Sequence, residues 1–140
     1  MSQAIFLPVI AMVGLTTLAF FRLAVARARA AQSATSDPSY YRAFLGAPEP
    51  EDVVVAVRHY GNLFEAPILV YIGCLSAYVL QAVSIWTLAF AWGYVFARTL
   101  QSAIHLTYNN PAHRGLAFAL GWLMIIALWA TIGGSIIVGL

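Results

Sequence analysis

Four long apolar runs constrain this chain more than any other feature of its sequence. They cover residues 5–31, 51–80, 84–108 and 112–138. Each can cross the hydrocarbon core of a bilayer, which takes about 20 residues as a helix. Inside lipid a segment must satisfy its own backbone hydrogen bonds, so each run is expected to be helical. The sequence therefore predicts an all-α integral membrane protein, with one domain over residues 1–140 that forms a four-transmembrane-helix bundle.

Composition supports this class and excludes others. The chain is 62% hydrophobic and 9% charged, whereas a soluble domain is roughly 25% charged. Its net charge of +2 is too small to favour nucleic acid as a partner. The single cysteine, Cys74, excludes an intrachain disulfide, and the three histidines form no His-x-x-x-His pair. No metal site is therefore expected.

The arginines predict the orientation of the chain in the membrane. The longest polar stretch, residues 32–50, follows the first run, and Asn109-Asn110-Pro111 follows the third. Arginines flank these two connections but are missing from the termini and from the other connection, so the positive-inside rule places the two connections in the cytoplasm and both termini opposite. The absence of lysine and the Ala/Arg-rich usage hint at a bacterial source, for which the membrane would be the inner membrane.

The second run carries an unusual set of polar residues. Arg58, Asn62 and Glu65 stand at positions i, i+4 and i+7, which lie on one face of a helix. Ionisable groups inside a membrane cost several kcal/mol unless they face a partner or a wet cavity, so this face is a functional-site hypothesis. Pro67 follows two residues after Glu65 and predicts a kink just after it.

A second polar stripe runs along the third run, at spacings of 4, 3, 4 and 3. Its members are Tyr94, Arg98, Gln101, His105 and Tyr108. At 1.5 Å per residue the two polar faces reach similar depths, so they can meet in a cytoplasm-facing pocket. Arginine forks bind carboxylates and Glu65 can hold an ammonium, which indicates a small anionic or zwitterionic ligand. The alternative is that an arginine only pairs with Glu65 and fixes helix register; the excess of arginines over the one acid disfavours it.

The motif Arg58-x-x-x-Asn62-x-x-Glu65 ahead of a proline, within four spans of this length, resembles the MAPEG family of membrane-associated proteins in eicosanoid and glutathione metabolism. The ending Ala26-Arg27-Ala28-Arg29 of the first run, Ala97-Arg98 with its stripe, and Arg114 at the start of the fourth run also have counterparts in that family's pattern. The similarity covers the whole chain.

The resemblance implies a homotrimer in the lipid bilayer that binds glutathione as co-substrate between neighbouring subunits, near the cytoplasmic face. Arg114 matches the arginine that holds the glutathione sulfur as a thiolate, the catalytic role. The matching glutathione-binding residues are Arg27, Arg58, Asn62, Glu65, Arg98, Gln101 and His105.

The resemblance therefore implies a glutathione-dependent transferase or peroxidase that acts on a lipophilic small molecule. His105, Gly115 and Phe118 depart from residues frequent in active members, which bears on substrate and efficiency. The alternative function is a non-catalytic protein that binds an anionic lipid or metabolite in the same pocket. A small transporter is disfavoured, because the polar groups stop midway through the membrane.

Overall fold

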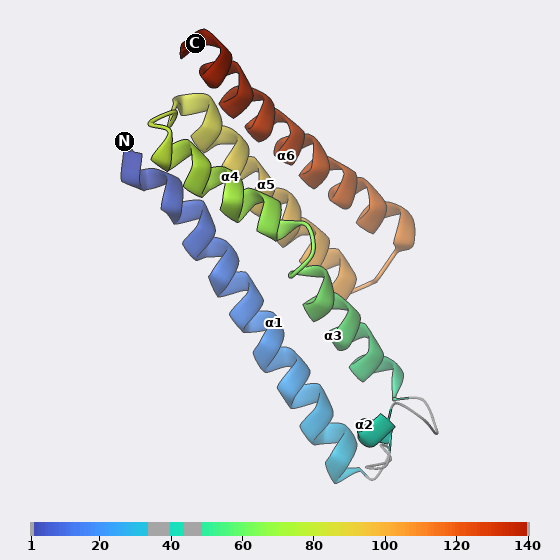
Figure 1. Ribbon diagram of the computed structural model, residues 1–140. Coiled ribbons are helices and arrows are strands. Elements are labelled where there is room, and N and C mark those ends of the chain that lie inside the picture. Colours follow the sequence, from blue (N-terminus) through green and yellow to red (C-terminus); the bar gives the residue numbers. More distant parts are fainter. Residues whose placement is uncertain (1, 34–39, 44–48, 140) are drawn as a thin grey trace.

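A computed structural model (Figure 1) describes residues 2–33, 40–43 and 49–139, and most of these residues are helical. A 3-10 turn at Ser2–Ile5 leads into the first helix, and the all-α class predicted from the sequence is confirmed. The helices are α1 (Phe6–Gln32), α2 (Tyr40–Ala43), α3 (Glu51–Asn62), α4 (Pro67–Val79), α5 (Ile85–Leu106) and α6 (Pro111–Gly139). Most of the expected loop at 32–50 lies outside the described residues.

Three helical segments of the described chain are long and apolar enough to cross a membrane: Ser2–Gln32, Glu51–Val79 and Pro111–Gly139. They indicate an integral membrane protein. α5 is not among them, although its 22 residues extend about 33 Å at 1.5 Å per residue. Its polar residues lower its hydropathy, and several of them, including Arg98, Gln101 and His105, are buried against neighbouring helices.

The expected helix over residues 51–80 is interrupted rather than kinked. α3 ends at Asn62 and α4 begins at Pro67, so that residues 63–66 form a non-helical break. Proline has no N–H to donate to the carbonyl of residue 63, which ends the regular hydrogen-bond ladder. The ladder tightens instead, because Leu63 N–H donates to Tyr60 O at 3.1 Å and Phe64 N–H to Gly61 O at 2.9 Å.

Local sequence explains where the other helices begin. α5 starts with a capping box, in which the Ser84 side chain accepts from Thr87 N–H and the Thr87 side chain accepts from Ser84 N–H. α3 opens with Glu51 and Asp52, which complement the positive end of the helix dipole. The four expected helices therefore begin within a residue of the predicted positions. The exceptions are the break before Pro67 and the short helix α2, which lies within the predicted loop.

The helices pack side by side as an elongated bundle, with both termini at one end and the α1 to α3 connection at the other (Figure 1). α5 and α6 form the most extensive contact. α1 packs on α4 near its start, where Phe6 contacts Tyr78, and on α3 near its end, where Ala26 clusters with Val53. Two glycines allow close approach to α6: a Cβ on Gly93 would lie 2.7 Å from Met124 Sδ, and one on Gly73 would lie 3.0 Å from Leu128 Cδ2. The polar ends of α3, α5 and α6 meet near the break.

Candidate functional site

A polar cavity of about 260 Å³ lies where α3, the end of α5 and the start of α6 come together. Its lining is formed by Arg58, Gly61, Asn62, Glu65, His105 and Arg114. Five of these six are residues that the sequence singled out, and they come from three different helical segments and from the break. A cavity with two arginines and one glutamate suits a small ligand that carries both signs of charge.

Arg58 and Glu65 supply opposite charges to the cavity without neutralising each other. Both side chains are exposed, and within the described part of the chain neither has a hydrogen bond or an ion pair. Asn62, which closes α3, is half-buried between them. Because the helix breaks after Asn62, Glu65 is carried on the non-helical segment and still reaches the same cavity. Each of these charges is therefore available to a ligand group of the opposite sign.

Arg114 is held in place by the turn that precedes its helix. The Asn109 backbone is in the left-handed region with φ of 46°, and its side-chain oxygen accepts from Arg114 Nη1 at 2.8 Å. Asn110 Oδ1 accepts from the N–H groups of Ala112 and His113 at 2.9 and 3.2 Å, which caps the start of α6. The Asn-Asn-Pro break therefore aims a half-buried arginine at the cavity.

Arg98 and Gln101, which the sequence grouped with the ligand-binding residues, lie behind the cavity and do not line it. Arg98 is 2% exposed, donates from Nε to Tyr94 Oη at 2.9 Å and from Nη1 to Gln101 Oε1. Its Nη2 donates to the backbone carbonyl of Asn62 at 2.7 Å. In a continuous helix that carbonyl would accept from residue 66, so Arg98 satisfies an acceptor that the break releases.

His59 is a residue of this region that the sequence reasoning missed. It is 4% exposed and its ring lies edge-to-face on His105, with 5.4 Å between the ring centroids. The two histidines are 46 residues apart in sequence, so no local spacing announces their contact. The available signal was weaker: His59 lies three residues after Ala56 and four before Leu63, both apolar and both buried, and so belongs to the inner face of α3.

Arg27 does not line the polar cavity of its own chain. It lies near the end of α1, where its Nε is 3.8 Å from Glu49 Oε1. Its side chain is 43% exposed. The structure thus brings together Arg58, Asn62, Glu65, His105 and Arg114, and leaves Arg27, Arg98 and Gln101 outside the lining.

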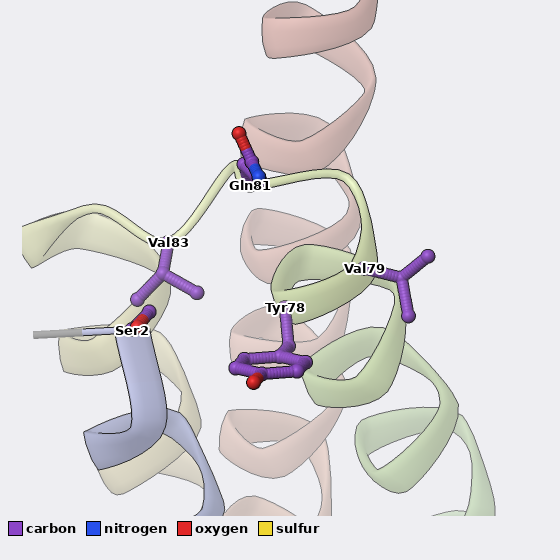
Figure 2. A pocket seen from close by; sticks show the side chains of 5 residues that line it. All are labelled: Ser2, Tyr78, Val79, Gln81 and Val83. Carbon is purple, nitrogen blue, oxygen red and sulfur yellow. The ribbon is translucent and has the colours of Figure 1, made fainter.

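Two further hollows differ in chemistry. An apolar one of about 420 Å³ lies on the α1 side of the break, lined by Val13, Thr16, Thr17, Leu63, Phe64, Ile68 and Tyr71. Figure 2 shows another, of about 410 Å³ near the N-terminus, whose lining of Ser2, Tyr78, Val79, Gln81 and Val83 carries no charge. Among the described residues, no three His, Cys, Asp or Glu side chains are grouped so as to hold a metal ion.

The model of the MAPEG family matches residues 5–134, nearly the whole chain. No curated protein and no solved structure matches.

Proposed function

Since the chain belongs to the MAPEG family, we propose that it is a glutathione-dependent transferase or peroxidase that activates glutathione as a thiolate against lipophilic electrophiles. Members of this family are membrane-associated proteins of eicosanoid and glutathione metabolism. The observation that carries the proposal is the meeting of Arg58, Glu65 and Arg114 around one polar cavity in a membrane protein.

Glutathione matches the charges of this cavity. It has two carboxylates, one ammonium and one thiol. Arg58 offers a planar fork that binds a carboxylate through two hydrogen bonds, and Glu65 can accept from the ammonium. Asn62, between them, can donate to or accept from a peptide group of the ligand. Arg98 contributes indirectly, because its Nη2 donates to the carbonyl of Asn62 at the start of the break that carries Glu65. Gln101 in turn accepts from Arg98 Nη1 and so helps to position Arg98.

Arg114 is the residue proposed to act on the sulfur. A free thiol has a pKa of about 8.5, so at neutral pH it is mostly protonated and a weak nucleophile. A guanidinium beside the sulfur favours the thiolate, and each tenfold gain in thiolate requires about 1.4 kcal/mol of interaction. Arg114 is half-buried, where a charge is screened less than in water, and Asn109 holds only one of its nitrogens in place.

The lipophilic partner would come from the bilayer. The apolar hollow on the other side of the break shares Leu63 and Phe64 with the segment that carries Glu65. The hydroxyls of Thr16 and Thr17 in its wall donate to Met12 O and Val13 O, so they are already satisfied. Such a surface suits the apolar part of an electrophile, while glutathione enters from the water on the polar side.

The proposed assembly is a homotrimer in which α5 is the fourth membrane span. Its buried polar stripe makes α5 less hydropathic than the other spans but keeps these groups away from lipid. We place the cavity and the arginine-flanked connections on the cytoplasmic side of the membrane, following the positive-inside rule. Arg27, which lies outside the cavity of its own chain, would reach the glutathione bound by a neighbouring subunit.

A substitution at Arg114 separates this function from the alternative, a non-catalytic protein that binds an anionic lipid or metabolite. Arg114→Ala should lower turnover with a model electrophile by about a hundredfold, because thiolate stabilisation is lost. Glutathione affinity, measured by calorimetry in detergent, should change less than tenfold. Arg29→Ala, at an exposed arginine near the end of α1, is the matched control. A wild-type protein that binds glutathione and never conjugates any electrophile supports the alternative.

A further inference from the structure

Two buried imidazoles beside the polar cavity have unused hydrogen-bonding capacity. His105 is 3% exposed and His59 is 4% exposed. Within the described part of the chain, His105 Nδ1 and His59 Nε2 have no hydrogen-bond partner. A buried polar atom in this state costs roughly 1–3 kcal/mol, so a pair of them at one place calls for a functional reason.

His105 stands between two cavities. One is the polar cavity, where it lies with Arg58 and Arg114. The other, of about 380 Å³, is lined on α3 by Glu51 and Asp52. Among the described residues, no other residue lines both cavities. The ring therefore connects the proposed site of the thiol with a compartment that contains carboxylates.

We propose that His105 carries the thiol proton of bound glutathione from the polar cavity to the outer cavity, an inference that rests on the proposed function. The S–H bond breaks, its electron pair stays on the sulfur as the thiolate beside Arg114, and the proton bonds to a ring nitrogen of His105. The imidazolium then gives a proton to the carboxylate of Asp52 or Glu51, and from there it passes to water. The neutral imidazole is restored, and no oxidant or reductant is needed.

The charges around the His105 ring favour passing the proton on to the outer cavity over keeping it on the imidazole. Arg58 and Arg114 share one cavity with His105, and Arg22 of α1 shares the other. These guanidiniums repel a proton that remains on the imidazole, whereas Glu51 and Asp52 attract it outward. His59 is the positioning residue in this scheme, since its ring packs edge-to-face on His105 and fixes the orientation of that ring.

The relay can be tested in the purified full-length protein by rapid mixing with glutathione. The ultraviolet absorbance of the thiolate reports loss of the proton from the sulfur. A pH indicator in weak buffer reports release of the proton to water. His105→Ala and His105→Gln should each slow thiolate formation about a hundredfold. The thiolate finally formed per bound glutathione should be unchanged, because Arg114 is intact. Free imidazole should restore the rate of His105→Ala. The control is His113→Ala, an exposed histidine of α6 that lines neither cavity.

Three outcomes would overturn the relay and leave the proposed function intact. The first is a His105 variant that forms thiolate as fast as the wild type, and the second is a slow variant that imidazole does not restore. The third concerns the double variant Glu51→Gln, Asp52→Asn, in which both replaced residues are exposed. This variant should release the proton several times more slowly than the wild type. An unchanged release rate would contradict the proposed exit route. A wild-type protein that binds glutathione without forming thiolate overturns the proposed function itself, and the relay with it.

Discussion

At the scale of single residues, the lining of the polar cavity contains charged side chains in two different environments. Arg58 and Glu65 face it with unpaired charges, whereas Arg114 is half-buried and oriented by Asn109. This difference fits the proposed roles, in which Arg58 and Glu65 bind the charged ends of the ligand. In the same proposal, Arg114 stabilises the reacting sulfur.

Removing a ligand-holding charge should weaken binding more than chemistry. Arg58→Ala should reduce glutathione affinity by ten- to a hundredfold, because a hydrogen bond to a charged group contributes about 1.5–3 kcal/mol. Glu65→Gln should also weaken binding, through the ligand's ammonium. Calorimetric titration in detergent measures both, and the rate at saturating glutathione should fall less than threefold. Unchanged affinity in both variants would contradict the assignment of these residues.

At the scale of elements, the break at residues 63–66 organises the site. Pro67 ends the hydrogen-bond ladder, and Arg98 of α5 donates to the carbonyl of Asn62 that the break releases. This contact ties α5 to the end of α3, while Glu65 lies in the break itself. Arg98 is thus best understood as the residue that fixes the shape of the cavity from behind.

Replacing Arg98 should destabilise the bundle. Arg98→Met removes the donors to Tyr94, Gln101 and Asn62 and leaves buried acceptors unpaired, so the free energy of unfolding should fall by at least about 1–3 kcal/mol, the cost of one such acceptor. Thermal unfolding in detergent measures the change, and glutathione affinity should fall with it. Arg42→Met, at an exposed arginine of α2, is the control. A variant as stable as this control would show that the buried arginine has no structural role.

The same elements show how far the sequence could predict the structure. Hydrophobic runs and caps located the helix ends, because both are local features. Pro67 indicated a disturbance but not its size, since an interruption of four residues depends on Arg98 satisfying the free carbonyl. Four members of the predicted stripe, Tyr94, Arg98, Gln101 and His105, form a buried polar face on α5, whereas the fifth, Tyr108, lies beyond the end of the helix and is exposed. The acceptor of Arg98 on α3 is a backbone atom that no residue pattern reveals. The contact of His59 with His105 likewise depends on how α3 and α5 pack.

At the scale of the whole molecule, the single chain holds five of the eight proposed site residues in its cavity lining. Arg27 is absent from that lining and lies beside Glu49. A homotrimer would explain how Arg27 can still bind glutathione, because Arg27 of one subunit could complete the site of the next. The ligand would then bridge subunits, which couples glutathione binding to assembly.

Mixed trimers test whether sites are shared. A chain with Arg27→Ala and a chain with Arg58→Ala are co-expressed with different affinity tags, and trimers that contain both are purified. If each site uses Arg58 of one subunit and Arg27 of the next, a mixed trimer regains one site of wild-type affinity. Trimers of either single variant should have none. Mixed trimers without such a site would indicate that Arg27 acts within its own chain or not at all.

The most direct test of the central claim is a glutathione titration of the purified wild-type protein in detergent at neutral pH, followed by the ultraviolet absorbance of the thiolate. If Arg114 stabilises the thiolate, the titration gives a saturable thiolate signal whose midpoint equals the calorimetric dissociation constant. The signal is then lost in Arg114→Ala, while glutathione still binds. Saturable binding with no thiolate signal in the wild type, or a signal that persists undiminished in Arg114→Ala, would contradict this role of Arg114.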